Sequence, residues 1–236
     1  MKLFNTLAIA AALLAGTAAQ AQSIDEIVKK HCDAVGGVAA WKTVKSMKLT
    51  GSLNIGGQEI PMTIATVNGK AQRTDFEVMG TKNYEIVTKT AGWSFQPIQQ
   101  QTKPQPMTAD ELKAKQEQLN LQDNLVDYAA RGNKVQYIGK EDLEGSECHK
   151  LKVTRPDGTA MTDFIDPKTF QIIRTTMKVT VDGKEVEVLV NYGNYQKLPE
   201  GITIPMTIDA GQMTIAMKSV EVNKITDESI FKPSAN

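Results

Sequence analysis

The sequence predicts a mainly β protein in which ten or eleven antiparallel strands form a strongly curved or closed sheet. Three observations carry this prediction. Apolar and polar residues alternate along most of the chain from Ser46 onward, which is typical of strands with one buried face. Short turn sequences such as Asn68-Gly69 and Asp182-Gly183 separate the alternating segments. Strands and helices do not alternate and no internal repeat is present, which argues against a parallel α/β sheet.

The first 21 residues have the pattern of a secretory signal peptide. Lys2 precedes an apolar stretch over residues 7–15, and Ala19-Gln20-Ala21 fits a cleavage site with small residues. This apolar stretch is too short for a membrane-spanning helix, and no other segment of the sequence approaches the required length. We therefore expect export to the periplasm, and a mature chain over residues 22–236 that forms a single domain.

The charge balance argues against a nucleic-acid partner. The chain holds 27 Lys and Arg residues against 27 Asp and Glu residues, so its formal net charge is zero. A protein that binds the phosphate backbone needs a basic surface, which this composition does not indicate.

Two short helices are expected at the start of the mature chain. Ser23 and Glu26 fit a capping box, and apolar residues follow at helical spacing up to Val35. Gly36-Gly37 is expected to end this helix. A second helix is expected over residues 38–45.

The strands follow in order, interrupted once by a polar segment. The first group is expected at residues 46–55, 60–64, 70–78, 83–88 and 93–95. Residues 99–106 are rich in Gln and Pro and predict a loop. A capping box at Thr108 and Glu111 predicts a helix to about Leu119, and a further helix is expected over residues 121–131. The second group of strands is expected at residues 135–140, 147–154, 160–165, 171–181, 184–192, 202–208 and 212–223.

Several of these strands combine methionine with branched aliphatic residues on one face. Methionine is flexible and polarizable, and it is common on surfaces that bind variable apolar ligands. The alternative is that these are ordinary core positions beneath the helices. The residues we expect to line an apolar cavity are Met62, Ile64, Phe76, Trp93, Phe95, Met177, Val179, Met206, Ile208, Met213, Ile215 and Met217.

The sequence contains no recognisable catalytic, nucleotide-binding or metal-binding motif. Its two histidines and two cysteines occur as the pairs His31-Cys32 and Cys148-His149. Cys148 and His149 are neighbours on an expected strand, so their side chains point to opposite faces and do not easily share one metal ion. We therefore expect no enzyme activity, no metal site and no cofactor.

The two cysteines leave two main alternatives open. In an oxidising compartment, an even number of cysteines favours a disulfide between Cys32 and Cys148. The alternative is that both thiols are unbonded and inert. A catalytic thiol is the third and least favoured interpretation. Cys148 alternates with Lys150, which argues mildly against its facing the core.

Three stretches of the sequence together resemble periplasmic outer-membrane lipoprotein-sorting proteins, the LolA-like group. HCDAVGGVAAWKTVKSMKLTGSL resembles their helix–GG–helix–strand opening, FIDPKTFQIIRTTM resembles a strand–Asp-Pro-x-Thr–strand hairpin, and YGNYQKLPEGITIPMTI resembles a further strand pair. The resemblance implies a half-open antiparallel β-barrel of about eleven strands wrapped over a few helices. It also implies a concave apolar face that accepts acyl chains.

The sequence thus predicts a periplasmic carrier or chaperone for a lipid or lipoprotein, with the helices of residues 108–131 as a lid. The alternative is a non-catalytic envelope module with a packed interior that binds or senses another protein. The expected partners are an acyl chain, a lipid or a lipoprotein, and possibly an envelope protein, but no nucleic acid. We expect a monomer without a transmembrane segment.

Overall fold

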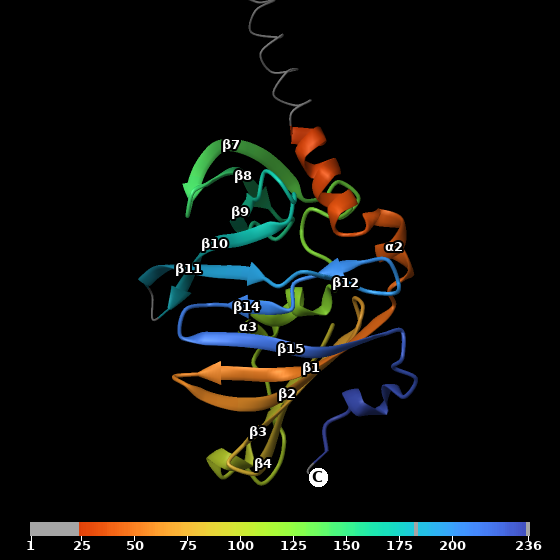
Figure 1. The fold of residues 1–236 in the computed structure, drawn as a ribbon. Coiled ribbons are helices and arrows are strands. Elements are labelled where there is room, and N and C mark those ends of the chain that lie inside the picture. The colour runs from red at the N-terminus through yellow and green to blue at the C-terminus, as the bar shows by residue number, and fades with distance from the viewer. Residues whose placement is uncertain (1–23, 182–183, 235–236) are drawn as a thin grey trace, which may run out of the picture. The chain divides into compact units, whose positions relative to one another are not determined.

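The computed structural model describes residues 24–181 and 184–234 (Figure 1). The predicted signal peptide, the Ser23 cap and the Asp182-Gly183 turn lie outside this range. The described chain divides into two compact units: residues 24–38 with 124–189, and residues 39–123 with 190–234. We call them the first unit and the second unit. Within the described ranges, no helix is long and apolar enough to cross a membrane. The single domain over residues 22–236 stays a prediction.

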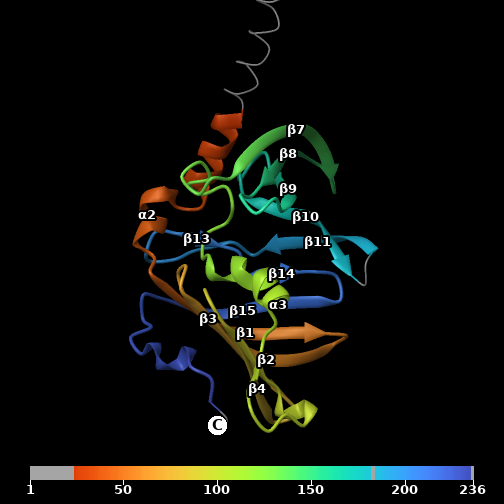
Figure 2. The ribbon, with the colours of Figure 1, turned by 180° about the vertical axis from the view of Figure 1, so that it is seen from behind.

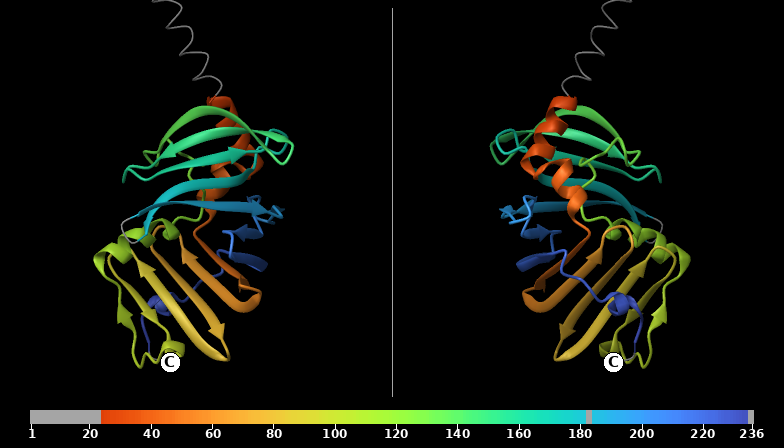
Figure 3. Two further views of the ribbon diagram at one scale, coloured as in Figure 1. Left: turned by 90° about the vertical axis from the view of Figure 1, so that its left-hand side faces the viewer. Right: turned by 90° about the vertical axis from the view of Figure 1, so that its right-hand side faces the viewer.

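The second unit contains most of the sheet. Its strands are β1 (Ser46–Ile55), β2 (Gln58–Val67), β3 (Ala71–Val78), β4 (Thr81–Thr88), β5 (Gly92–Phe95), β6 (Gln105–Pro106), β14 (Thr207–Asp209), β15 (Met213–Val222) and the end of β11 (Lys184–Gly193). They are hydrogen-bonded in the order β6-β5-β4-β3-β2-β1-β15-β14-β11. Figure 3 shows β1 to β4 side by side. The late strand β15 thus pairs with the early strand β1. A separate two-stranded sheet joins β12 (Gln196–Lys197) and β13 (Thr203–Ile204).

The first unit places a helix against an antiparallel meander. The helix covers residues 24–34, and the strands are β7 (Lys134–Leu143), β8 (Ser146–Thr154), β9 (Ala160–Ile165), β10 (Ile172–Val181) and the first part of β11, in the order β11-β10-β9-β8-β7. Leu151, Val153 and Ile165 are fully buried. The helix is tied to the β9–β10 turn by His31, whose Nδ1 lies 2.8 Å from the carbonyl oxygen of Phe170.

The predicted antiparallel, half-open fold of about eleven strands is confirmed. Eleven of the fifteen strands in the described residues have four residues or more, and the paired strands run antiparallel. The first two predicted helices are also confirmed, the second as α2 (Gly37–Thr43). The predicted strand over residues 202–208 is split into β13 and β14 around Pro205, which has no backbone N–H to donate to a ladder.

The polar middle segment was only half predicted. α3 (Ala109–Lys115) begins at the expected capping box, in which the Thr108 N–H donates to Glu111 Oε2 at 2.7 Å. It continues as η2 (Gln116–Leu119). The expected helix over residues 121–131 is wrong, because this segment forms irregular turns in which Asp127 has a left-handed φ of 55°. A short 3-10 helix, η1 (Pro97–Gln99), directly precedes the predicted loop and overlaps it only at Gln99.

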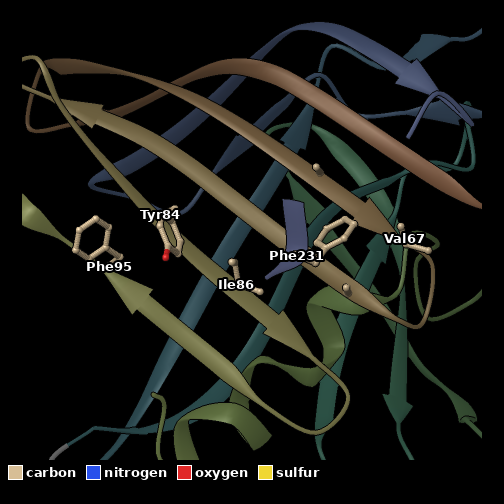
Figure 4. Packing of buried hydrophobic residues seen from close by; sticks show 7 residues of the cluster. Val67, Tyr84, Ile86, Phe95 and Phe231 are labelled. Atoms are coloured by element: carbon tan, nitrogen blue, oxygen red, sulfur yellow. The ribbon is translucent and has the colours of Figure 1, made fainter. Parts of the chain in front are cut away.

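The chain's C-terminal segment forms a strap over residues 225–234 that packs on the sheet of the second unit. It contains η3 (Glu228–Phe231), and Phe231 joins a buried cluster (Figure 4). The other members are Ala65, Val67, Ala71, Tyr84, Ile86 and Phe95, with Trp93, Ile225 and Ile230 packed against them. The strap is also held by hydrogen bonds. Arg73 donates to the Ile230 carbonyl at 2.9 Å, and the Ser234 N–H donates to Tyr84 Oη at 2.8 Å.

Replacing Phe231 with alanine tests whether the strap contributes to folding. Phe231 is 7% exposed, so the change removes a buried ring from the cluster. We expect the free energy of unfolding to fall by about 3 kcal/mol or more, measured by urea denaturation. Val186→Ala is the matched control, because Val186 is 44% exposed and its truncation should have little effect. Equal stability of the two variants would contradict a packed strap.

Candidate ligand-binding face

The register of the second unit's strands gathers apolar side chains on one face of its sheet. Residues paired directly across neighbouring antiparallel strands point to the same face. One such row runs across five strands and is apolar throughout. It consists of Tyr192, Ile208, Ile215, Leu53 and Ile60. We call the face that carries this row the apolar face.

The neighbouring rows continue the apolar face on both sides. A second row consists of Met217, Gly51, Met62, Phe76 and Asn83, and a third begins with Val220, Leu49 and Ile64. At the hairpin end, Met213 pairs with Ile55. Most of these apolar side chains are only half-buried, and Met213 and Ile55 are 42% and 46% exposed. The face therefore offers apolar surface that the described chain does not fully cover.

On β14, β15, β1 and the start of β2 the opposite face is mainly polar, whereas over β3 to β5 it carries the buried cluster around Phe231. Its rows include Asp209, Thr214, Asn54 and Glu59, and next to them Ser219, Thr50, Thr63 and Asp75. Lys218 on this side lies 3.1 Å from the carboxylate of Glu59. A sheet with one polar and one apolar side must bury the apolar side against something.

Helix α3 and η2 cover part of the apolar face, at its β3–β4 end (Figure 2). Lys115 bonds Glu85 at 2.8 Å, with the two side chains 31% and 23% exposed. Gln72 donates to the carbonyl of Gln118 at 2.8 Å. Leu119 is 3% exposed. These polar tethers fix the cover over β3 and β4, and they leave the rows on β1, β14 and β15 half-buried.

The structure separates the twelve residues predicted to line one cavity. Seven share the apolar face: Met62, Ile64, Phe76, Ile208, Met213, Ile215 and Met217. Met206 is half-buried just before β14, and its N–H donates to the Gly193 carbonyl. Met177 and Val179 are half-buried on β10, in the other unit.

Trp93 and Phe95 lie on the face of the sheet opposite the seven predicted residues that share the apolar face. Phe95 pairs with Tyr84, and Tyr84 pairs with Asp75, which neighbours Phe76 and therefore points the other way. Both aromatic residues pack in the cluster of the C-terminal strap. They stabilise the fold there and do not join the apolar face.

Sequence reasoning missed six apolar members of the apolar face, which are Leu49, Leu53, Ile55, Ile60, Tyr192 and Val220. Leu49, Leu53 and Ile60 could have been found from the sequence, because the Gly56-Gly57 turn pairs Ile55 with Gln58 and so sets the register of the hairpin. Tyr192 could not, since its place depends on the pairing of β11 with β14.

The bulge beside Gly51 explains why the second row contains a glycine. The register of β1 against β15 shifts between Thr50 and Gly51, so that Lys218 is the extra residue. A Cβ atom built on Gly51 would lie 2.1 Å from the carbonyl oxygen of Ala216. Glycine is therefore required where the β15 backbone comes closest.

The two cysteines are both buried and are not bonded to each other in the structure. The Cys32 thiol donates to the carbonyl of Leu125 at 3.7 Å. Cys148 is fully buried, contrary to what its alternation with Lys150 suggested. Burial raises the pKa of the Cys148 thiol, with Asp166 adding to the shift, so this thiol is poorly reactive. A disulfide between the two stays a prediction.

Both histidines contact Phe170, through different groups. His31 is fully buried and binds its carbonyl, whereas the His149 ring stacks on its ring with centroids 6.4 Å apart. Lys30 lies 5.1 Å above the same ring. The Nδ1 atom of His149 is buried without a hydrogen-bond partner.

In the described residues, no group of three or more His, Cys, Asp and Glu side chains could hold a metal ion.

Comparisons with known proteins agree on the fold. No protein-family model matches the chain, and no curated protein matches it. Solved structures resemble it at low identity, among them the following three. A DUF1329 family protein from Desulfovibrio piger has a TM-score of 0.55 at 14% identity, over 87% of this chain and 97% of that chain.

The other two carry names related to lipoprotein sorting. A putative outer membrane lipoprotein-sorting protein domain from Vibrio parahaemolyticus has a TM-score of 0.56 at 12% identity, over 87% of this chain and 94% of that one. A LolA superfamily protein from Nitrosomonas europaea has a TM-score of 0.56 at 11% identity, over 87% and 96% of the two chains. The chain therefore has a LolA-like fold, as its sequence predicted.

Replacing Gly51 with alanine should destabilise the protein, because the new methyl group collides with the Ala216 carbonyl. We expect the free energy of unfolding to fall by about 3 kcal/mol in urea denaturation. Gly193→Ala is the matched control, since a Cβ there meets no atom within 4 Å. A stable Gly51→Ala variant would contradict the close approach of β15.

The pH dependence of His149 provides a second test. Burial lowers the pKa of its imidazole, and the nearby Lys140 and Lys30 add to the shift. The folded protein therefore binds this proton more weakly than the unfolded chain, so stability should be lost as the pH falls below about 6.5. We expect an NMR titration midpoint below that value, and a smaller loss of stability in His149→Gln. A midpoint at or above 6.5 would contradict the assignment.

Proposed function

We propose that this protein is a non-catalytic periplasmic carrier or chaperone that binds the acyl chain of a lipid or lipoprotein on the apolar face. The observation that carries the proposal is the apolar row from Tyr192 to Ile60, which is half-buried except at Ile60 and lies on strands whose other side is polar along β14, β15 and β1. Exposed apolar surface of this continuity is uncommon on a protein without an apolar ligand or partner. The LolA-like fold supports the same interpretation, although a fold alone does not assign a function.

The chemistry of the face fits a flexible hydrocarbon chain. Met213, Ile215 and Met217 lie on its central strand β15 and Ile208 pairs with Ile215, so the side chains at the centre of the face are aliphatic or thioether groups. Such side chains adapt to ligands of varied shape and supply no directional hydrogen bonds. Each methylene group moved from water to this face contributes about 0.8 kcal/mol before the cost of ordering the chain. Long acyl chains are therefore favoured over short ones.

Helix α3 and η2 act as a partial lid in this proposal. They are held over β3 and β4 by the Lys115–Glu85 ion pair and the Gln72–Gln118 hydrogen bond. Both interactions are partly exposed to solvent, so each contributes little to stability. The cover can therefore adjust to an acyl chain at small energetic cost, whereas the strap on the opposite face stays packed on the sheet.

A charge placed on the apolar face should weaken acyl-chain binding. We expect Met217→Asp and Met213→Asp to raise the Kd for a dansyl-labelled fatty acid at least about tenfold, because an ionised carboxylate is poorly solvated beside hydrocarbon. Fluorescence titration measures this. Ala216→Asp is the matched control, since Ala216 lies between the two methionines and on the polar face. It should bind as the wild type does.

Mass spectrometry of the protein purified from its own periplasm identifies the ligand class. A bound lipid or acylated peptide, lost in Met217→Asp and kept in Ala216→Asp, would support the carrier. An empty wild-type protein that takes up no fatty acid or phospholipid would contradict it and favour a protein-binding module. Circular dichroism and urea denaturation establish that each variant is folded before its binding is compared.

A further inference from the structure

Exposed large apolar residues gather at one end of the strands of the second unit's sheet, along the edge that the hairpin turns form. Met79, Met213, Ile55 and Ile98 are 84%, 42%, 46% and 38% exposed. Ile55 precedes the β1–β2 turn, Met213 follows the β14–β15 turn, and Met79 lies in the β3–β4 turn. Because these strands are antiparallel neighbours, the three turns lie at the same edge. The β14–β15 and β1–β2 turns are on the left of Figure 1.

Ile98 extends this edge beyond β4. It lies in η1, directly after β5, and its N–H donates to the side chain of Asn83 at 3.4 Å. Asn83 is near the start of β4, beside the β3–β4 turn. We call Met79, Ile98, Ile55 and Met213 the apolar rim.

Met79 has a backbone conformation that methionine disfavours, so the requirements of folding do not explain why methionine occupies this turn position. Met79 and Gly80 have φ angles of 51° and 75°, and Val78 pairs with Thr81 across them. Two-residue hairpin turns with positive φ at both positions favour Asn-Gly, and methionine is disfavoured in the left-handed region. With 84% of its surface exposed, Met79 gains little from packing in compensation.

The charges beside the rim are balanced in pairs. Lys218 lies 3.1 Å from Glu59, and Glu77 lies directly opposite Lys82 in the register. The edge therefore has no strong field of either sign, which does not favour nucleic acid or a strongly charged protein surface. Apolar side chains on separate hairpin turns among balanced charges fit the interface of a zwitterionic lipid bilayer, which deforms around each side chain.

The rim is continuous with the apolar face. Ile55 and Met213 form the last pair of that face, and Leu53 and Ile215 are the next pair inward. We propose that the apolar rim docks on the surface of a zwitterionic bilayer, and that the acyl chain passes between the bilayer and the apolar face along these two pairs. The second part rests on the proposed carrier function, whereas the docking of the rim does not.

Vesicle flotation of the mature protein tests the docking. The probe is a phosphatidylethanolamine and phosphatidylcholine vesicle. We expect the wild type to float with the vesicles, and Met79→Asn and Ile98→Gln each to reduce the bound fraction about tenfold. Asparagine suits the left-handed turn position, so Met79→Asn should remain folded. Ile138→Gln is the matched control, because Ile138 is 47% exposed on β7, a strand of the first unit. It should float as the wild type does.

Fatty-acid binding measured without vesicles separates the two proposals. Met79→Asn with normal fatty-acid binding and lost flotation would support the rim. A wild type that binds fatty acid but does not float would overturn the rim and leave the carrier intact. Flotation without fatty-acid binding would overturn the carrier and keep the rim. Self-association that disappears in Met79→Asn, seen by analytical ultracentrifugation, would assign the rim to a second copy of the chain and overturn bilayer docking.

Discussion

The second unit depends on the pairing of β1 with two partners at once. β1 takes β2 as its hairpin neighbour and β15 from the other end of the chain, so both of its edges are hydrogen-bonded. Because side chains alternate with a period of two, this register decides which residues share a face. A shift by one residue would exchange Leu53 and Ser52 and would place the apolar row in water. The bulge at Gly51 is the one interruption in the pairing with β15, and it fixes the register there.

The two faces of this sheet are covered by different segments of the chain and to different extents. Over β3 and β4, the side opposite the apolar face is closed by the C-terminal strap, whose Phe231 is buried in one cluster with Ala65 and Ala71. The apolar side is covered by α3 and η2 through polar tethers, and only in part. Dense packing on one side gives a stable support, while the incompletely covered side keeps apolar surface available for a ligand. The carrier we propose needs both properties in one sheet.

The edge of the sheet adds a feature that folding does not require. A left-handed methionine at a hairpin turn opposes local backbone preference, and such departures from local consistency are expected at functional positions. Around Phe170 in the first unit, by contrast, the unusual residues are structural. His31 satisfies a backbone carbonyl, and His149 is held between aromatic rings. The two histidines are thus part of the structural core of the first unit, whereas exposed methionines such as Met79 lie at the surface position for which we propose a function.

The sequence by itself determined the strands, most of their turns and the capping box of α3, because these depend on alternation, turn residues and local hydrogen bonds. It also indicated strand positions for seven residues that the structure brings to one face, since side chains alternate along each strand, and their role in binding stays a prediction. Only the tertiary structure decided that Trp93 and Phe95 belong to the opposite face, because nothing local reveals that the strap of residues 225–234 returns to cover them. The same holds for Tyr192 and for residues 121–131, where long-range pairing and the left-handed Asp127 decide the conformation. Contacts between distant segments of the chain leave no periodic pattern in the sequence.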